Sequence, residues 1–400
     1  MNRREFTQLL AIASAANIFP RTAFSNHSEA ASKKMYDMPN FGNARLLHIT
    51  DSHAQLKPIY FREPSVNIGI HEENGKPPHI VGKHFLDYFN IATNSIQAHA
   101  FTSLDFIASA EKYGKVGGYS HLSTLIKQLR QSYGDTDRTL LLDGGDTWQG
   151  SATAYWTRGR DMVEASNILG VDVMTGHWEF TYQDTEILDN IEAFNGEFLA
   201  HNVKVNEDTG NAFKPYTIKT MGDHRIAVIG QAFPYTPIAN PSRFIPDWTF
   251  GIQASELQEL IEEVKGNEQP DAIILLSHNG MDVDLKLAAT VSGLDVILGG
   301  HTHDGVPKPV HVKNAAGTTL VTNAGSNGKF VGVLDMDLGE GHVKDFRYTL
   351  LPVFSNYIDA DPEMETFIDG VRAPYESQLN ETLAVSDELL YRRGNFNGTF

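Results

Sequence analysis

The chain has 400 residues, a formal net charge of −18 and no cysteine. A chain of this length usually folds as two domains, or as one large domain with the start of another. The acidic balance argues against a protein that binds the phosphate backbone of nucleic acids, and the absence of cysteine excludes disulfides, thiolate zinc sites and a cysteine nucleophile. Any metal site in this chain must therefore use oxygen and nitrogen ligands.

The first 31 residues have the pattern of an export signal. Arg3 and Arg4 precede an apolar run at 9–19 that is too short to span a bilayer, and small residues follow at 23–31. A chance basic start on an amphipathic helix is the alternative, but the three segments occur in the order that export requires. We therefore predict a twin-arginine signal and a periplasmic protein that binds neither nucleic acid nor a membrane.

After this leader, short apolar runs alternate with helical patterns, which indicates strands interleaved with helices in a layered α/β fold. The strands expected in chain order are 45–49, 139–142, 171–174, 198–200, 225–229, 272–276 and 296–298. The helices expected between them are 121–131, 162–169, 253–264 and 284–291. Later runs at 310–313, 318–321, 330–336 and 342–351 are expected to add antiparallel strands, and a helical stretch covers 362–379.

Residues 57–116 interrupt this alternation with a long connection that contains several prolines and many polar residues. A connection of that length inside a compact domain is usually either functional or disordered. It could be functional, with Tyr60 and nearby aromatic residues as candidates, or it could be packed surface of no special role. The sequence favours neither alternative.

Five short polar clusters each follow a predicted strand, at 51–53, 143–146, 176–179, 277–280 and 299–303. The carboxyl ends of strands in an open α/β sheet meet at one crevice, so clusters far apart in sequence can lie together. Mixed Asp and His ligands suit a borderline divalent ion, and the clusters offer more ligands than one ion needs. The candidate metal ligands are Asp51, His53, Asp146, His278, His301 and His303.

The spacing within these clusters has a physical reason. In Asp51-x-His53 and His301-x-His303, residues two apart at a strand end can point to the same side and give one ion two ligands. Asp146 can bridge two ions, because its carboxylate offers one oxygen to each. Each cluster alone is more often a turn or a helix cap, but five of them at five strand ends make coincidence a poor explanation. The sequence therefore predicts a two-metal hydrolase.

In order and type, these clusters resemble the calcineurin-like metallophosphoesterases, and more closely their 5′-nucleotidase branch. The resemblance runs from about Ala44 to Leu351 and implies a layered sandwich of mixed β-sheets flanked by helices. Residues 392–400 resemble the opening of the nucleotidase C-terminal domain. The implied organisation is a signal peptide at 1–31, a catalytic domain at 32–355 with the insertion at 57–116, and a linker helix with an incomplete C-terminal domain at 356–400.

The third cluster departs from the nucleotidase pattern Gly-Asn-His-Glu-Phe-Asp, in which Asn binds a metal and the His–Asp pair stabilises the transition state. Residues 176–181 read Gly-His-Trp-Glu-Phe-Thr. His177 can still bind a metal, but Trp178 and Thr181 replace the catalytic pair. This departure argues against efficient hydrolysis of phosphate esters, because the groups that would assist the leaving oxygen are gone.

Longer stretches at 48–65, 176–182 and 277–284, with the leader, resemble one subfamily, the SoxB thiosulfohydrolases of bacterial sulfur oxidation. That resemblance implies an enzyme with two divalent ions, a manganese pair, and a substrate that is a sulfonated sulfur chain on a cysteine of a SoxYZ-type carrier protein. Sulfate would be released by a metal-bridging hydroxide, since a sulfonate is a tetrahedral oxyanion like phosphate. The persulfide leaving group needs little protonation, which explains the loss of the His–Asp pair.

Under this hypothesis each ion has four ligands, with Asp146 shared between them. One ion would be held by Asp51, His53, Asp146 and His303, and the other by Asp146, His177, His278 and His301. Asp146, His177, Arg62 and Trp178 are the catalytic candidates, the last two for contacts with the sulfonate and its channel. Two alternatives stay open, a periplasmic 5′-nucleotidase or phosphoesterase and a non-catalytic metal-binding protein that docks on the carrier.

Overall fold

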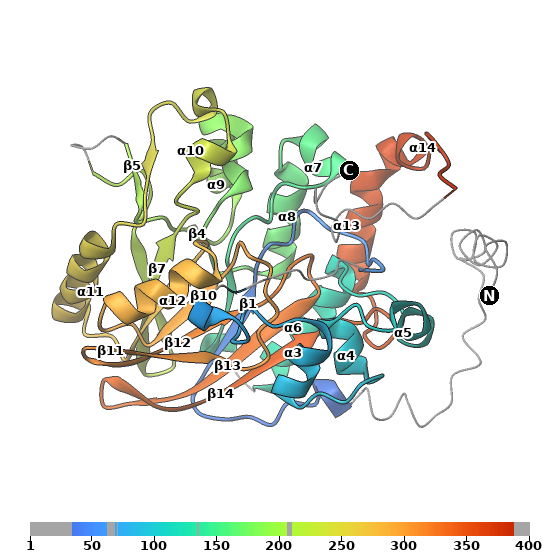
Figure 1. Ribbon diagram of the computed structural model, residues 1–400. Coiled ribbons are helices and arrows are strands. Elements are labelled where there is room, and N and C mark those ends of the chain that lie inside the picture. The colour runs from blue at the N-terminus through green and yellow to red at the C-terminus, as the bar shows by residue number, and fades with distance from the viewer. Residues whose placement is uncertain (1–33, 62–68, 70, 134–135, 206–209, 388–400) are drawn as a thin grey trace. The chain divides into compact units, whose positions relative to one another are not determined.

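The computed structural model describes residues 34–61, 69, 71–133, 136–205 and 210–387 (Figure 1). The predicted signal at 1–31, Arg62 and the stretch 392–400 lie outside these residues. The chain forms two compact units, Met1–Asp37 and Met38–Phe400. Within the first, the structure describes a short 3-10 helix, η1 (Lys34–Tyr36), and all the other elements belong to the second.

The first of two six-stranded sheets has the strand order β14-β13-β1-β2-β3-β4. Its strands are β1 (Ala44–Ile49), β2 (Thr139–Asp143), β3 (Val173–Met174), β4 (Glu197–Phe198), β13 (Phe330–Gly339) and β14 (His342–Pro352). Strands β1 to β4 run parallel, whereas β13 pairs antiparallel with β1 and β14 antiparallel with β13. The carboxyl ends of β1, β2 and β3 therefore lie at one edge of this sheet.

The second sheet has the order β11-β12-β10-β9-β7-β6. Its strands are β6 (Tyr216–Met221), β7 (His224–Gln231), β9 (Ala272–Ser277), β10 (Val296–Gly299), β11 (Val310–Asn314) and β12 (Gly317–Asn323). The four inner strands are parallel and the two edge strands, β6 and β11, are antiparallel to their neighbours. A separate pair, β5 (Val203–Lys204) and β8 (Thr249–Phe250), forms a small antiparallel sheet.

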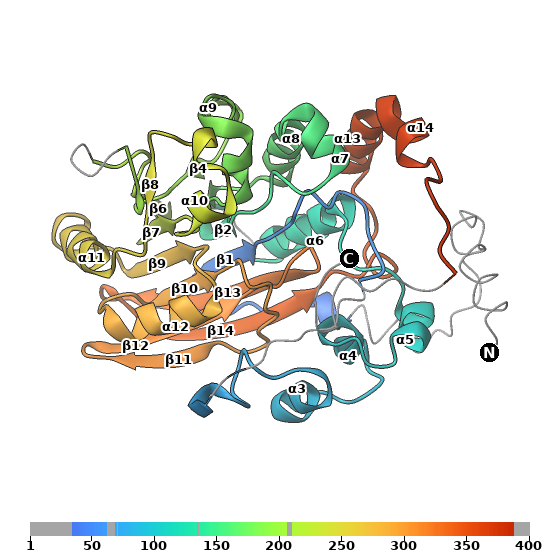
Figure 2. The same ribbon diagram turned by 45° about the horizontal axis from the view of Figure 1, so that its top comes forward.

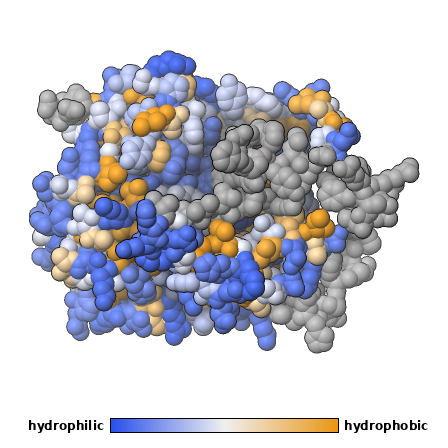
Figure 3. All heavy atoms as spheres, in the orientation of Figure 1, coloured by the Kyte–Doolittle hydropathy of each residue, from blue (hydrophilic) through white to orange (hydrophobic). Residues whose placement is uncertain are grey.

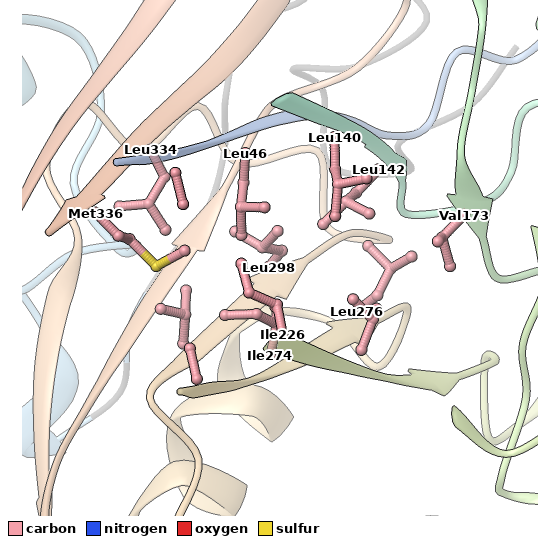
Figure 4. Packing of buried hydrophobic residues seen from close by; sticks show 14 of the residues in the cluster. Leu46, Leu140, Leu142, Val173, Ile226, Ile274, Leu276, Leu298, Leu334 and Met336 are labelled. Atoms are coloured by element: carbon pink, nitrogen blue, oxygen red, sulfur yellow. The ribbon is translucent and has the colours of Figure 1, made fainter. Parts of the chain in front are cut away.

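The two large sheets pack face to face around a core of aliphatic side chains (Figure 4). Leu46 and Leu142 from the first sheet meet Ile226 and Leu298 from the second, and all four are fully buried. Because side chains alternate along a strand, the neighbour of Leu46 faces the other way. Arg45 accordingly donates to the backbone carbonyl of Leu129 at 2.9 Å, on a helix that covers the outer face of the first sheet.

Helices cover both outer faces of this sandwich (Figure 2). Helices α11 (Ala254–Glu268) and α12 (Met281–Thr290) pack on the second sheet through a second aliphatic cluster. On the first sheet lies α6 (Tyr119–Ser132), and α8 (Arg160–Leu169) and α13 (Pro362–Arg372) pack against it and against each other. The expected layered sandwich of mixed β-sheets flanked by helices is confirmed.

The shorter helices complete the fold. They are α3 (Gly82–Phe89), α4 (Ile96–Phe101), α5 (Phe106–Tyr113), α7 (Ala152–Thr157), α9 (Gln183–Ala193), α10 (Thr236–Ala239) and α14 (Glu376–Leu379). The 3-10 turns are η2 (His71–Glu73), η3 (Thr136–Arg138), η4 (Trp178–Tyr182), η5 (Ser242–Phe244) and η6 (Ala373–Tyr375). None of the helices in the described part of the chain has the length and hydropathy that a membrane span requires. The face seen in Figure 3 is mostly hydrophilic, with hydrophobic residues in small groups.

Two expectations about the elements need correction. Residues 318–321 were expected to form an antiparallel addition; β12 pairs antiparallel with β11, as expected, but it pairs parallel with β10. Its residues Thr319 to Asn323 are buried, so β12 takes the inner position and β11, whose burial alternates, takes the edge. The connection 57–116 is also not a plain loop, because it contains α3, α4 and α5.

The helices of this connection form because they bury aromatic faces. Leu86 and Phe89 of α3 are buried, and Phe85 stacks on Phe101 of α4 with ring centroids 5.6 Å apart. Phe101 in turn stacks on Phe330 of β13 at 4.9 Å. The connection is thereby packed onto the end of the sandwich where β13 begins.

Candidate metal centre

The predicted metal ligands lie together at one end of the sandwich. They stand just beyond the carboxyl ends of β1, β2 and β3 in the first sheet and of β9 and β10 in the second. Among the described residues, three groups of three residues have ligand atoms within 4.8 Å of one another, and one of them, Asp51, Asp146 and His278, shares a residue with each of the other two. We call His177, His278 and His301 the three-histidine group, and Asp51, His53 and His303 the Asp51 group.

Asp146 lies between the two groups. Its Oδ1 is 3.7 Å from His53 Nδ1, and its Oδ2 is 3.1 Å from His177 Nδ1 and 3.7 Å from His278 Nε2. Asp51 has a similar position, because its Oδ1 is 3.4 Å from His303 Nε2 and 3.6 Å from His278 Nε2. Both carboxylates can therefore serve either group.

The backbone holds several of these residues in the left-handed region, which L side chains rarely adopt. The positive φ angles are +51° at Asp51, +48° at His53, +59° at Asp146, +73° at His301 and +59° at His303. Such a conformation costs on the order of 1–3 kcal/mol and persists only where the surroundings enforce it. Hydrogen bonds between the two loops do so here, from Asp51 N–H to the Gly145 carbonyl at 2.8 Å and from His53 N–H to the Asp146 carbonyl at 2.9 Å.

Glu179 fixes the loops that carry Asp146 and His177. Its buried carboxylate accepts four backbone N–H groups, those of Asp146 at 3.2 Å, Thr147 at 2.7 Å, Trp148 at 3.1 Å and His177 at 2.7 Å. Buried N–H groups without an acceptor would destabilise the fold, so this side chain satisfies four donors at once. Sequence reasoning gave Glu179 no role, although it lies within the third cluster, two residues after His177 and inside η4.

Further hydrogen bonds orient individual ligands. His278 Nδ1 lies 2.6 Å from the Gly144 carbonyl, which makes Nδ1 the protonated nitrogen and leaves Nε2 to face the two carboxylates. The backbone N–H of His301 donates to both oxygens of Asp51, at 3.1 and 2.9 Å. Gly300 permits this approach, because a Cβ at that position would lie 2.4 Å from Thr50 Oγ1.

The charges of the centre are strongly coupled. Burial alone would raise the pKa values of Asp51 and Asp146, but the neighbouring histidines hold both below the usual range. Burial lowers the pKa of His278, yet Asp51 and Asp146 outweigh it and raise that pKa to about 9. Burial and the positive charge of His278 lower the pKa of His301 to about 3. At neutral pH the centre therefore has two carboxylates and at least one neutral imidazole.

The donor set fits divalent metal ions. Asp146 Oδ1, His177 Nε2 and His278 Nε2 are buried and have no hydrogen-bond partner among the described residues. Buried polar atoms of this kind need an explanation, and ligation of a cation would satisfy all of them. Nitrogen and carboxylate ligands without sulfur suit borderline first-row ions, consistent with the cysteine-free sequence.

The other candidates from the sequence have mixed positions. Trp178 lies beside the centre, its ring centroid 5.0 Å from that of His177, whereas Thr181 Oγ1 donates to Asn240 Oδ1 at 3.1 Å. Arg62 lies outside the described residues. Tyr60 is exposed, and Lys115 Nζ lies 5.4 Å from the centroid of its ring.

A cavity of about 450 Å³ opens beside the centre. Its lining includes His301 and His303 of the centre and Phe85 and Phe101 of the helical connection. His53 and His303 are 22% exposed, whereas His278 is fully buried, so the Asp51 group is the more accessible part of the centre. The connection 57–116 thus contributes a wall to the cavity that adjoins the predicted ligands.

Phe233 belongs to the centre although it was absent from the sequence prediction. Its ring centroid is 3.9 Å from that of His301 and 4.2 Å from that of His177. A phenyl ring offers no ligand atom, so a search for ligating residues passes over it. Its position just beyond the end of β7, like the other clusters beyond their strands, was the available signal.

No family model matches the sequence. In structure the chain is similar to the sulfate thiohydrolase SoxB of Thermus thermophilus, with 34% identity and a TM-score of 0.84 over 90% of this chain and 65% of that one. It is also similar to a 5′-nucleotidase precursor of the same species, with 22% identity and a TM-score of 0.67 over 85% of this chain and 60% of that one.

In sequence, the chain is similar to 5′-nucleotidases. It is 27% identical to the enzyme of Bos taurus over 67% of this chain and 49% of the relative, and 30% identical to a snake venom enzyme of Gloydius brevicauda over 55% and 40%. The chain thus spans half or less of the length of these curated relatives. These similarities and the buried Asp and His centre agree with the resemblance of the sequence to the 5′-nucleotidase branch of the metallophosphoesterases.

Proposed function

We propose that this protein is a dinuclear-metal hydrolase that releases sulfate from a cysteine S-thiosulfonate, a sulfonated sulfur chain on a cysteine of a sulfur carrier protein. The observation that carries the proposal is the third cluster, where His177 keeps its place in the centre while Trp178 and Thr181 stand where nucleotidases have a catalytic His–Asp pair. The structural similarity to a sulfate thiohydrolase over 90% of this chain supports the same reaction.

The residues that would hold the ions are those of the two groups with Asp146 between them. Asp51, His53, Asp146 and His303 would hold one ion, and Asp146, His177, His278 and His301 the other. When bound, a pair of divalent ions, which we propose to be Mn²⁺, would activate water and offset the charge of the sulfonate oxygens.

The side chains next to this centre suit a leaving group of low basicity. The alkoxide that leaves a phosphate ester needs a proton from a positioned acid. The indole of Trp178 does not titrate near neutral pH, and the hydroxyl of Thr181 is engaged with Asn240. A persulfide leaves as a stable anion, so the absence of an acid at these two positions has little consequence for it.

The reaction balances without an oxidant or reductant. The oxygen of water bonds to the sulfonate sulfur, and the bond between that sulfur and the next sulfur of the chain breaks. The electron pair leaves with the carrier, which becomes a cysteine persulfide. One proton of water protonates the persulfide or is released, the other is released, and the second product is sulfate.

The cavity beside the centre supports a substrate that is presented on an extended arm. Its lining includes both His301 and His303 and the helices of the connection 57–116, so the end of a chain that enters the cavity can reach these two histidines. We propose a carrier protein of the SoxYZ type as the partner, and the periplasm, reached by twin-arginine export, as the location.

A 5′-nucleotidase activity is the second candidate, and the curated relatives favour it, because those of Bos taurus and Gloydius brevicauda are named 5′-nucleotidases. One experiment separates the two candidates. The full chain, loaded with Mn²⁺, is given a protein or peptide with a cysteine S-thiosulfonate, and in parallel a nucleoside monophosphate. We expect sulfate release that a chelator abolishes and much slower phosphate release. Phosphate without sulfate would favour the nucleotidase, and two bound ions with neither product would indicate a non-catalytic protein.

A further inference from the structure

A single phenyl ring contacts every imidazole of the three-histidine group. The ring of Phe233 stacks on His301 with a centroid distance of 3.9 Å and an interplanar angle of 29°. It lies tilted on His177 at 4.2 Å, and it meets His278 edge to face at 6.4 Å and 90°. By contrast, His53 and His303 of the Asp51 group pack on each other, with centroids 4.8 Å apart.

The contact matters most for His301. A histidine that binds a metal usually donates its second ring N–H to an oxygen, which fixes the plane of the ring. His278 has such a partner in the Gly144 carbonyl at 2.6 Å. No hydrogen bond among the described residues orients the ring of His301, whose backbone φ of +73° is itself unusual. His301 also meets the rings of His177 at 5.1 Å and His278 at 5.4 Å, but its contact with Phe233 is the shortest and the only stacked one among the described residues, so Phe233 contributes most to the plane of this imidazole.

The backbone of Phe233 is rigidly held. Its N–H donates to the Gly176 carbonyl at 3.1 Å, next to His177, and its carbonyl accepts the hydroxyl of Thr236 at 2.8 Å. The preceding residue, Ala232, is bonded at both its N–H and its carbonyl to the side chain of Asn202, at 2.8 Å each. A ring attached to a backbone held in this way is pre-organised, and it can fix the orientation of neighbouring side chains that have fewer contacts.

We propose that Phe233 is a positioning residue for the three-histidine group. Its ring fixes the planes of His301 and His177 and so raises the affinity of the protein for one of the two ions. The proposal rests on the metal-binding part of the proposed function and not on its substrate. It assigns to a phenyl ring the task that the Gly144 carbonyl performs for His278.

The test is a titration of Mn²⁺ into the metal-free full chain, by calorimetry and by electron paramagnetic resonance, with no substrate present. Phe233→Leu removes the ring and keeps much of the apolar volume, whereas Phe233→Tyr keeps the ring. Phe213→Leu is the matched control, because Phe213 is 9% exposed against 8% for Phe233 and packs on Phe180 and Trp248 instead.

Loss of an outer partner of a metal ligand typically lowers affinity about 10- to 100-fold. We expect Phe233→Leu to lower the affinity for one ion by about that factor and to change the affinity for the other ion less. Phe233→Tyr and Phe213→Leu should bind both ions as the unchanged protein does. Equal binding by Phe233→Leu, or an equal loss in Phe213→Leu, would overturn the proposal. If the unchanged protein binds no Mn²⁺, the proposed function has the wrong cofactor, and that failure is distinct from a failure of the role of Phe233.

Discussion

Glu179 accepts the backbone N–H of His177 at 2.7 Å, and its other carboxylate oxygen accepts that of Thr147, also at 2.7 Å. One buried side chain thus joins the loop after β2 to the loop after β3. Asp146 and His177 belong to these two loops, so the distance between two candidate ligands depends on a residue that ligates nothing.

The first prediction concerns Glu179→Gln. An amide keeps one acceptor oxygen for two of the four N–H donors and turns its own N–H₂ toward the other two. Each buried donor left without an acceptor costs about 1–3 kcal/mol. We expect the free energy of unfolding to fall by at least about 2 kcal/mol in urea denaturation. Glu192→Gln, exposed on α9, should change little, and a Glu179→Gln protein as stable as this control would contradict the prediction.

The second prediction compares Asp146→Asn with His53→Ala. Asp146 Oδ1 lies 3.7 Å from His53 Nδ1, and Asp146 Oδ2 lies 3.1 Å from His177 Nδ1. Loss of this carboxylate should therefore lower the affinity for both ions. His53 belongs to the Asp51 group alone, so its loss should lower the affinity for one ion. Elemental analysis after dialysis against limiting Mn²⁺ measures the number of ions that each variant retains per chain. Loss of a single ion in both variants would show that Asp146 is not shared.

The third prediction is that Mn²⁺ affinity rises with pH. Asp51 and Asp146 raise the pKa of His278 to about 9 against the effect of burial, so in the metal-free protein this imidazole carries a proton at pH 7. A ligand must be neutral to bind, so the ion displaces that proton. One released proton gives about a tenfold gain in affinity per pH unit below pH 9. Titrations at pH 6.5, 7.5 and 8.5 with equal affinity would contradict this assignment.

The sequence was most informative where polar residues directly follow buried strands. Asp51, Asp146 and His278 stand just beyond β1, β2 and β9, and parallel strands bring such ends to one edge. Strand direction was harder, because an apolar run such as 318–321 is equally compatible with a parallel and an antiparallel neighbour. Pairing partners, which are distant in the chain, decide between them.

Other features depend on contacts that no local pattern encodes. The role of Phe233 follows from where its ring lies relative to His301, and a phenylalanine after a strand usually signals only the core. The helices in 57–116 were missed because prolines and polar residues obscure the short aromatic faces that pack on Phe330. Glu179 lies within the third cluster, yet the four backbone N–H groups that it accepts come from two different loops.

The fourth prediction concerns Asp284, whose pKa burial raises to about 7. Between about pH 4 and 7 the unfolded chain has lost this proton and the folded protein keeps it, so the free energy of unfolding falls as pH rises and levels off above pH 7. The range is on the order of 4 kcal/mol, since each pKa unit is worth about 1.4 kcal/mol. Asp284→Asn removes the titration and keeps an oxygen for Ser277 Oγ, which donates at 2.7 Å.

Urea unfolding of the metal-free proteins at pH 5 and pH 8 measures this effect. We expect the free energy of unfolding to fall from pH 5 to pH 8 by more in the unchanged protein than in Asp284→Asn. Asp345→Asn, at an exposed position of β14, should behave like the unchanged protein. A parallel pH dependence in Asp284→Asn and the unchanged protein would show that Asp284 has an ordinary pKa.

The last prediction addresses the third cluster directly. Trp178→His with Thr181→Asp restores the nucleotidase pair beside His177, and a positioned general acid contributes about 10²- to 10⁴-fold to catalysis. We expect phosphate release from a nucleoside monophosphate to rise at least about tenfold, because an alkoxide leaving group needs this proton and a persulfide does not. Trp178→His alone should gain less, since its imidazole lacks the orienting carboxylate. A double variant that still binds two ions and shows no gain in phosphate release would mean that these two positions do not separate sulfur from phosphorus chemistry.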